Sequence, residues 1–344
     1  MRRVPATIVT GFLGAGKTSL IRHLLAHAEG RRLAIVVNEF GELGIDRELL
    51  LGCGEAECAE DPRRTPGLSK EDIVELKNGC LCCTVASDFL PALERLFERE
   101  NPPEHILIET SGLALPKPLL QAFAWPEIKT RTTVDGVLAV IDAAALLSRD
   151  FDGGRLATQT ALHDNPVEEV FADQLAVADL VILNKTDLVA PSDLSALSRA
   201  IAARLRAGVR LLPARQARVP AAVALGLSAA AEDDLLSRPT QHELAGDHDH
   251  DDFESFVVAL GPISDARQLL ARLGAIVESH AVLRVKGFVE ESGRERRRVV
   301  EAVGARLSSY FDRPWQKDEE RATRLVVIGE RGLDRAAIRA ALEG

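Results

Sequence analysis

The sequence predicts an α/β fold, in which a mostly parallel sheet forms a first domain and a smaller α+β domain follows it. Short apolar runs alternate with helical patterns over the first part of the chain, as in βαβ units. A glycine-rich loop joins the first run to the first helical pattern, and a new series of alternating residues begins at Phe253. We therefore expect domains at residues 1–228 and 253–344, joined by an acidic, histidine-containing linker at 229–252.

Length, composition and charge limit the classes of protein that fit. The chain has 344 residues, of which 46% are hydrophobic, and this is enough for two domains with their own cores. The formal net charge of −10 argues against binding nucleic acid through its phosphates. No uncharged run reaches the roughly 18 residues that cross a bilayer, and the N-terminus has no secretory pattern. We expect a cytoplasmic protein with neither a nucleic-acid nor a membrane partner.

The glycine-rich loop lies between an apolar run at residues 5–10 and a helical pattern at 19–28. Its sequence, G-F-L-G-A-G-K-T, is typical of a phosphate-binding loop, where backbone N–H groups and a helix N-terminus surround a polyphosphate. Lys17 adds a mobile positive charge, and the Thr18 hydroxyl suits Mg²⁺. The alternative is a chance match in a glycine-containing turn. The loop predicts a P-loop NTPase domain whose nucleotide-binding residues include Gly11, Gly14, Ala15, Gly16, Lys17, Thr18 and Ser19.

A second strand is predicted at residues 32–37, and it ends at Asn38-Glu39-Phe40-Gly41. Loops at such strand ends carry function in doubly wound sheets. The glycine-rich, acidic segment at 41–46 and the polar stretch after it predict a long loop. A γ-phosphate and Mg²⁺ would order such a loop as a switch. The alternative is an unremarkable surface insertion.

All five cysteines lie between positions 53 and 83, namely Cys53, Cys58, Cys80, Cys82 and Cys83. In a reducing compartment this clustering indicates metal or redox chemistry more than a disulfide scaffold. The last three follow a strand predicted at 72–76 and precede a helix that Thr84 would cap. A helix N-terminus lowers the pKa of a thiol, and thiolates are ligands that Zn²⁺ and Cu⁺ favour. A metal site is therefore predicted, with redox chemistry and simple packing as the alternatives.

Two further strand ends carry polar motifs. The strand predicted at residues 105–109 ends on Glu109, to which we assign the binding of Mg²⁺ and its waters, with a solvated acid as the alternative. Gly112 would let the backbone approach the γ-phosphate. A strand at 180–183 leads into N-K-T-D, in which Asp187 would accept the guanine N1–H and N2 amine, a donor pair that adenine lacks. We therefore predict GTP, bound also by Asn184 and Lys185; an ATP-dependent kinase is a rival hypothesis.

The remaining elements are predicted from periodicity alone. They are a strand at 134–142, a helix at 192–208 and a strand at 209–213, then strands from 253, at 282–289 and at 324–328, with helices at 264–273, 299–307 and 334–342. In the linker, His248 and His250 alternate with acids that would collect divalent ions weakly, or are simply solvated. Basic clusters at 284–287 and 294–298 are docking surfaces or solvated faces.

The motifs G-F-L-G-A-G-K-T, N-E-F-G, N-G-C-L-C-C, I-E-T-S-G-L and N-K-T-D occur in this order. With them the chain resembles the CobW family of P-loop GTPases over essentially its whole length. The resemblance implies a metal-handling GTPase, commonly a metallochaperone, whose C-x-C-C motif binds a transition-metal ion near the Mg-nucleotide. The ligands that it implies are Cys80, Cys82 and Cys83, with Glu39 as a nearby partner. The implied cofactors are GTP, Mg²⁺ and Co²⁺ or Zn²⁺.

The resemblance also implies delivery of metal to a client metalloprotein or metal chelatase. GTP hydrolysis is expected to be slow, because no residue stands out as a water-orienting glutamine or an arginine finger. The expected catalytic residues are Lys17, Glu39 and Glu109, of which Glu39 is the weakest candidate. The additional pair Cys53 and Cys58 resembles the cobalamin-pathway branch, which favours Co(II) for cobalamin biosynthesis over zinc supply. A nucleotide-gated metal sensor or buffer is the rival from another class.

Overall fold

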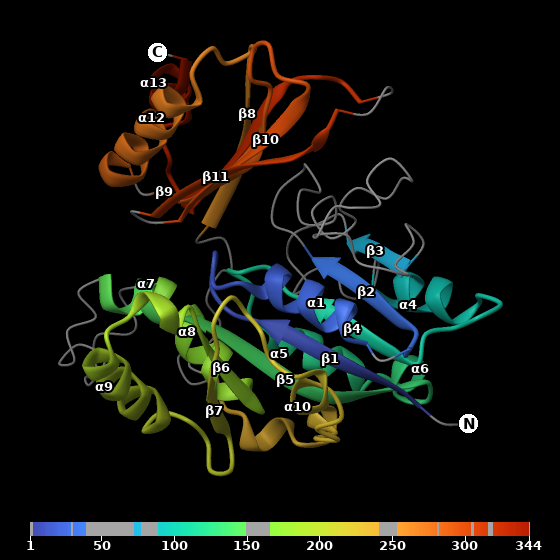
Figure 1. Cartoon of the computed structure of the whole chain (residues 1–344). Coiled ribbons are helices and arrows are strands. Elements are labelled where there is room, and N and C mark those ends of the chain that lie inside the picture. Colours follow the sequence, from blue (N-terminus) through green and yellow to red (C-terminus); the bar gives the residue numbers. More distant parts are fainter. Residues whose placement is uncertain are drawn as a thin grey trace. The chain divides into compact units, whose positions relative to one another are not determined.

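The computed structural model describes residues 3–28, 30–38, 72–76, 89–148, 166–240, 253–280, 282–303, 306–315 and 319–343. The chain has two compact units, whose described residues are those up to 240 and those from 253 onward. We call them the N-terminal and the C-terminal unit (Figure 1). Within these ranges, no helix is long and apolar enough to cross a membrane.

A seven-stranded sheet forms the centre of the N-terminal unit, in the order β3-β2-β4-β1-β5-β6-β7, and every described pair is parallel. The strands β1, β2, β4 and β6 are buried along nearly their whole length, as expected where helices cover both faces. The strands are β1 Val4–Thr10, β2 Leu33–Asn38, β3 Ile73–Leu76, β4 His105–Glu109, β5 Thr132–Asp142, β6 Leu180–Asn184 and β7 Arg210–Pro213. The α/β prediction is thereby confirmed.

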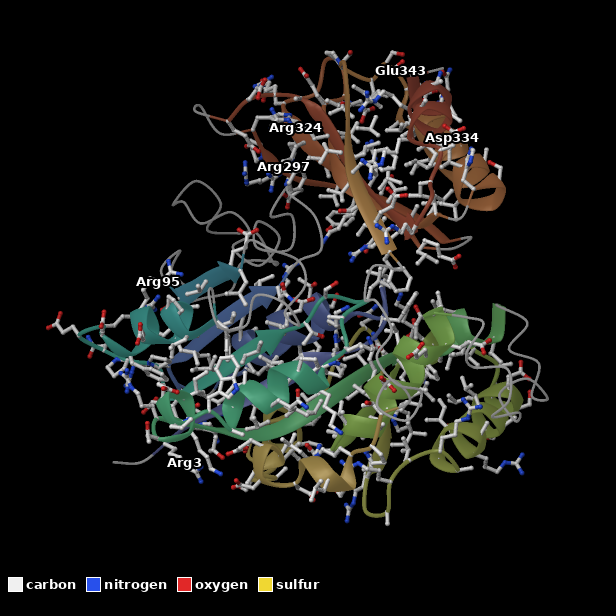
Figure 2. All side chains as sticks on the ribbon, turned by 180° about the vertical axis from the view of Figure 1, so that it is seen from behind. Arg3, Arg95, Arg297, Arg324, Asp334 and Glu343 are labelled. Atoms are coloured by element: carbon white, nitrogen blue, oxygen red, sulfur yellow. The ribbon has the colours of Figure 1, made fainter. Side chains whose placement is uncertain are left out.

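The helices of this unit lie on both sides of the sheet. They are α1 Lys17–Ala26, α4 Leu90–Phe97, α5 Lys117–Phe123, α6 Pro126–Lys129, α7 Ala143–Ser148, α8 Pro166–Val177, α9 Pro191–Ala202 and α10 Ala221–Ala224. In Figure 1, α1 lies in front of the sheet, and Figure 2 shows other helices covering the opposite face. One core cluster joins Leu93 and Phe123 to the strands β1 and β4, and another joins Phe171 and Leu197 to β5 and β6.

The register of the sheet brings the carboxyl ends of its central strands together. Val9 of β1 pairs with Glu109 of β4, and Asp142 of β5 pairs with Asn184 of β6. Because parallel strands run in one direction, the loops that leave them gather at the same edge. The polar motifs predicted at separate strand ends are therefore neighbours in space.

The helix predicted at residues 192–208 is shorter than expected, since α9 ends at Ala202. The residues after it turn back toward α8, because the Arg206 guanidinium donates to the carbonyls of Ala176 and Ala178, both at 2.8 Å. Gly208, with φ 88°, completes the turn into β7. A tertiary contact therefore ends this helix where its periodicity predicted a further turn.

Residues 229–240, predicted as the start of a solvated linker, pack into the N-terminal unit. The buried Glu232 accepts hydrogen bonds from the Thr133 hydroxyl at 2.6 Å and from the backbone N–H of Val134 at 2.9 Å. The buried Arg238 pairs with Asp179 at 2.7 Å. The prediction of a solvated stretch is wrong for Glu232 and Arg238, which are buried and paired, whereas Asp233 and Asp234 are exposed. Residues 241–252 lie outside the described ranges, and the predicted domain boundaries stay a prediction.

The C-terminal unit is an antiparallel sheet with helices on one face, which confirms the α+β prediction. Its strand order is β11-β10-β9-β12-β8, and α12 packs on β9, β10 and β11 while α13 packs on β8. The core between them contains Leu269, Leu273, Val285 and Val327. The elements are β8 Phe253–Leu260, α12 Ala266–Ser279, β9 Val282–Val289, β10 Arg296–Val303, β11 Arg306–Pro314, β12 Thr323–Glu330 and α13 Arg335–Glu343.

The helix predicted at residues 299–307 is wrong, because this stretch forms the hairpin of β10 and β11. Val300 pairs with Ser309 across the hairpin. Val300 and Ala302 face the core, whereas Glu301 between them pairs with Arg284 of β9 at 2.6 Å. This alternation, together with valines that favour strands, outweighs the apolar spacing that suggested a helix.

The two basic clusters of this unit are largely neutralised within it. Arg297, labelled in Figure 2, is 1% exposed and donates to Asp312 and Glu319, both at 2.8 Å. Its guanidinium carbon also lies 3.8 Å from the centre of the Phe288 ring. Arg297 is therefore neither a solvated residue nor a docking group. Its guanidinium links two acids and an aromatic ring within the C-terminal unit.

Candidate functional site

The glycine-rich loop between β1 and α1 is held against the ends of two other strands. Gly11 has φ 136°, and a Cβ atom there would lie 2.1 Å from the carbonyl oxygen of Val140 on β5. Gly16 has φ 108°, and a Cβ atom there would lie 2.5 Å from Nδ2 of Asn184. Both positions therefore require glycine, since any side chain would push the loop off the sheet.

Lys17 begins α1 and its side chain folds back over the loop. Its Nζ donates to the carbonyl oxygens of Gly11 at 2.8 Å and Phe12 at 3.3 Å, and the residue is buried. The ammonium is thus held at the mouth of the loop, where phosphate oxygens would replace these carbonyls as acceptors. This position fits the predicted role of Lys17.

Thr18 and Glu109 meet beside the loop. The Thr18 hydroxyl donates to Oε1 of Glu109 at 2.8 Å, across the join between α1 and the end of β4. Glu109 is 4% exposed. A hydroxyl and a carboxylate make an oxygen-only donor set, which suits a hard cation such as Mg²⁺ and gives no soft ligand to a transition metal. The two residues therefore fit the Mg²⁺ that accompanies a polyphosphate.

Gly112 lies close to the loop, because a Cβ atom there would be 2.7 Å from the backbone nitrogen of Leu13. Its carbonyl oxygen accepts a hydrogen bond from Nε2 of Gln174 at 3.2 Å. Gln174 belongs to α8 and is 2% exposed. The sequence analysis missed this residue, although a glutamine among apolar positions of a buried helix face was the available signal.

The N-K-T-D motif, at the end of β6, braces the phosphate loop. Asn184 donates from Nδ2 to the carbonyl of Ala15 at 2.9 Å, and its Oδ1 accepts from the backbone N–H of Ala217 at 2.7 Å. Lys185 has φ 59°, and its Nζ lies 2.7 Å from both the Gly14 carbonyl oxygen and Oδ2 of Asp142. The contacts of Asp142 and Ala217 were not predicted from the sequence.

Asp187 is the exposed member of the motif. It lies in the short 3₁₀ helix η6 (Thr186–Leu188), which the Thr186 hydroxyl anchors by donating to the Ala214 carbonyl at 2.9 Å. Asn184 and Lys185 are thus engaged with the loop, whereas Asp187 presents its carboxylate to solvent. The Asp187 carboxylate is therefore accessible to the hydrogen-bond donors of a ligand. Ser19, on the first turn of α1, is exposed as well.

The predicted transition-metal ligands lie outside the described residues. These are Cys80, Cys82, Cys83 and Glu39, and the same holds for Cys53, Cys58, His248 and His250. Within the described ranges, no group of three His, Cys, Asp or Glu side chains could hold a metal ion. Asn38, which precedes Glu39, is 2% exposed, and its side-chain amide has no hydrogen-bond partner among the described residues. The transition-metal site therefore stays a prediction.

A glycine-rich loop of the phosphate-binding type after β1, a buried carboxylate at the end of β4 and an N-K-T-D motif that starts at the end of β6 are the features of a P-loop GTPase. The family description "CobW/HypB/UreG, nucleotide-binding domain" matches residues 5–212, and "Cobalamin synthesis protein cobW C-terminal domain" matches residues 253–344. The chain belongs to the CobW/HypB/UreG family, which confirms the resemblance seen in the sequence. It is a GTPase.

Named relatives are similar over nearly the whole chain. The "Zinc chaperone CobW" of Sinorhizobium sp is 48% identical over 351 residues, covering 99% of this chain and 96% of that one. The "Zinc chaperone CobW" of Pseudomonas aeruginosa is 48% identical over 347 residues, covering 98% and 90%. Among solved structures, Zn(II)-bound YjiA GTPase from E. coli matches with a TM-score of 0.41 and 24% identity, covering 99% and 98%.

Proposed function

We propose that this GTPase is a metallochaperone, which binds a transition-metal ion under the control of GTP and delivers it to a client metalloprotein or chelatase. The observation that carries the proposal is the 48% identity to proteins named zinc chaperones, over nearly the full length of both chains. The donor set of the nucleotide site also supports the proposal. Thr18 and Glu109 offer only oxygen ligands, so a transition-metal cargo would need a separate site with softer ligands such as thiolates.

In the proposed nucleotide complex, the phosphates lie in the loop from Gly11 to Thr18, and Lys17 neutralises their charge. The Thr18 hydroxyl and the Glu109 carboxylate would hold Mg²⁺, which when bound stabilises the negative charge that develops on the phosphates. The backbone of Gly112 is close enough to the loop to approach the terminal phosphate. Asp187 would accept the two donors of guanine, while Asn184 and Lys185 keep the loop in place.

The proposed transition-metal site uses Cys80, Cys82 and Cys83, with Glu39 as a nearby partner. The sheet supports this set, because Asn38, the last residue of β2, pairs with Leu76, the last residue of β3. The strands β2 and β3 therefore end side by side at the same edge of the sheet. On the other side of β2, Val37 pairs with Glu109 of the proposed magnesium site.

This adjacency supports coupling between nucleotide and metal. A segment that begins beside Glu109 and contains Glu39 would be drawn toward Mg²⁺ and the terminal phosphate when GTP binds, and this movement would complete the thiolate site. Hydrolysis would release the segment and the cargo. Coupling of this kind is reciprocal, so a tenfold effect of nucleotide on metal affinity implies a tenfold effect of metal on nucleotide affinity.

We propose zinc as the cargo, because both 48%-identical relatives carry that name. The preference for cobalt, predicted from Cys53 and Cys58, is the competing proposal for the same site. Thiolate ligands accept either ion, and soft thiolate sites are among those that select Zn²⁺. The two proposals therefore differ in selectivity and in client, while the chemistry of the site is shared.

The test is a competitive titration of the full chain with Zn²⁺ and with Co²⁺, with Mg²⁺ and either GDP or a non-hydrolysable GTP analogue present. We expect at least tenfold tighter metal binding with the GTP analogue, which corresponds to about 1.4 kcal/mol. Cys82→Ser should abolish tight metal binding while GTP affinity stays within about twofold. The matched control is Cys58→Ser, which should retain the nucleotide effect.

Three outcomes would contradict parts of this proposal. Equal metal affinity with GDP and with the GTP analogue would contradict the proposed control of metal binding by GTP. Tight metal binding that survives Cys82→Ser would move the site elsewhere. GTP turnover that neither metal nor a metal acceptor stimulates would favour a nucleotide-gated sensor or buffer over a chaperone.

A further inference from the structure

A second cavity lies at the amino edge of the N-terminal sheet, where β1, β4 and β5 begin. Its volume is about 880 Å³, and its wall includes Arg3, Arg31, His105, Asp135 and Ser228. His105 is the first residue of β4 and Glu109 is the last, so this cavity and the nucleotide site are at opposite edges of the same strands. Figure 2 labels Arg3 at this edge.

His105 is one of the buried polar residues in the wall of this cavity. It is 3% exposed, and its Nε2 lies 2.7 Å from the Thr7 hydroxyl oxygen, while that hydroxyl lies 3.3 Å from Oδ2 of Asp135. Because Asp135 can only accept, the Thr7 hydroxyl donates to it, and the Thr7 oxygen therefore accepts from Nε2–H of His105. This tautomer leaves Nδ1 as an acceptor on a residue that lines the cavity, with no partner among the described residues.

The imidazole stays uncharged at neutral pH. Burial lowers the pKa of His105 to about 4, although Asp135 opposes the shift, and Arg31 lowers the pKa further. Arg31 and Asp135 are the charged groups that face the ring. A neutral imidazole with an acceptor nitrogen is complementary to a ligand that carries a hydrogen-bond donor, such as a hydroxyl group.

The acids near the cavity are occupied by other donors. Asp135 accepts from the backbone N–H groups of Gly226 at 2.7 Å, Leu227 at 3.2 Å and Ser228 at 2.9 Å. Glu104 accepts from the backbone N–H of Arg32 at 3.0 Å. Both acids belong to the wall of the cavity, and each already accepts hydrogen bonds from backbone donors. Within the described ranges no cluster of acids and histidines could hold a cation here.

Two arginines supply the positive charge in the wall of the cavity. Arg31 is exposed and has no ion-pair partner among the described residues, and Arg3 makes a 3.4 Å pair with Glu232 while its side chain keeps 38% exposure. Guanidinium groups bind phosphate and carboxylate in a planar, two-pronged geometry. Across the cavity, Ser228 and Ala230 hold left-handed backbone without glycine, with φ 53° and 46°, a strained wall of the kind found at ligand sites.

We propose that this cavity is a second ligand site, which takes a small hydroxylated anion. Arg31 and Arg3 bind the anionic group, and Nδ1 of His105 accepts a hydrogen bond from a hydroxyl group of the ligand. The volume is within the range of small-molecule sites, which is roughly 300–1,000 Å³. The site needs neither the metal nor the cysteines, so its existence is independent of the chaperone proposal.

The test is calorimetry on the full chain saturated with Mg²⁺ and a non-hydrolysable GTP analogue, so that the phosphate loop is filled. The probes are ribose 5-phosphate, gluconate and inorganic phosphate, each added up to a concentration of about 10 mM. We expect ribose 5-phosphate or gluconate to bind at least tenfold more tightly than inorganic phosphate. The tighter of the two identifies the anionic group as phosphate or carboxylate.

Arg31→Glu should weaken that binding at least tenfold. The matched control is Arg199→Glu, on the exposed face of α9, which should leave it unchanged. In NMR spectra, the His105 ring nitrogens should shift on binding. Absence of binding by both hydroxylated probes, equal affinity in Arg31→Glu, or a hydroxylated anion no tighter than phosphate would each overturn the proposal.

Discussion

The two edges of the seven-stranded sheet use the same strands, β1, β4 and β5, but satisfy their polar side chains differently. At the carboxyl edge, Lys17 and Lys185 donate to carbonyls of the phosphate loop. At the amino edge, Thr7, His105 and Asp135 bond to one another and to backbone N–H groups. At the first edge, Lys17 holds its charge on carbonyl acceptors that a ligand can replace. At the second edge, Thr7, Asp135 and Nε2 of His105 are engaged within the fold, and Nδ1 of His105 is left for the proposed ligand.

The difference teaches where substitutions should affect chemistry and where they should affect stability. Groups at the carboxyl edge are placed for a ligand, so their loss should lower activity or affinity at nearly constant stability. At the amino edge, the buried polar groups satisfy one another's hydrogen bonds, so removing one of them should lower the free energy of unfolding.

The largest expected effect at the carboxyl edge comes from Lys17→Ala. We expect kcat/KM for GTP to fall by roughly 10²- to 10³-fold, because the charge that neutralises the phosphates is removed. Steady-state phosphate release measures it. Lys129→Ala is the control, since Lys129 pairs on the surface with Asp233 at 2.5 Å and should leave turnover unchanged. A fall in kcat/KM of less than tenfold would show that GTP hydrolysis does not depend on the charge of Lys17.

Asp187→Asn should change which base is bound. Asparagine replaces one acceptor with a donor, so we expect roughly 100-fold weaker GTP binding and tighter binding of XTP, whose base has an oxygen in place of the N2 amine. Competition with a fluorescent nucleotide measures both affinities, and Asp193→Asn, in the first turn of α9, is the control. An unchanged preference for GTP over ATP would mean that guanine is recognised elsewhere.

The smallest expected effect concerns the amino edge and depends on pH. The folded-state pKa of His105 is lowered from 6.5 to about 4, so the unfolded chain binds a proton that the folded chain does not between these values. Stability is therefore full above pH 6.5 and declines as the pH falls toward 4. Between pH 7 and pH 4.5 this decline amounts to about 2 kcal/mol.

Denaturant unfolding of the wild type and of His105→Gln, at both pH values, measures this contribution. The variant should lose less stability over the interval, because glutamine can still donate to Thr7 and does not titrate. GTP turnover at pH 7 should remain within a few-fold of the wild type. An identical decline in both proteins would assign the pH dependence to other groups.

The local motifs of the nucleotide site could be predicted from the sequence because their function depends on spacing along the chain. The loop from Gly11 to Thr18, Glu109 and Asp187 all follow short apolar runs, and strand ends of a parallel sheet meet at one edge. The contacts of Gln174, Asp142 and Ala217 could not be predicted, because each joins residues that are distant in sequence.

The errors have a related cause. The stretch at 299–307 has apolar spacing that fits either a helix or a strand, and only its pairing with β9 and β11 decides the outcome. The acids at 229–240 look solvated by composition, yet Glu232 is buried because the Thr133 hydroxyl and the Val134 N–H satisfy it. The composition of a segment does not show whether a charged side chain in it will be buried with hydrogen-bond donors from another segment.

The brace formed by Asn184 and Lys185 has a consequence for the kinetics of nucleotide binding. Both side chains hold the phosphate loop through the carbonyls of Ala15 and Gly14, and these bonds exist before any base is bound. Phosphates of GTP and ATP therefore meet the same preformed cradle and should associate at similar rates. Discrimination between them then depends on the dissociation rate of each nucleotide, which the proposed contact of Asp187 with guanine would lower for GTP.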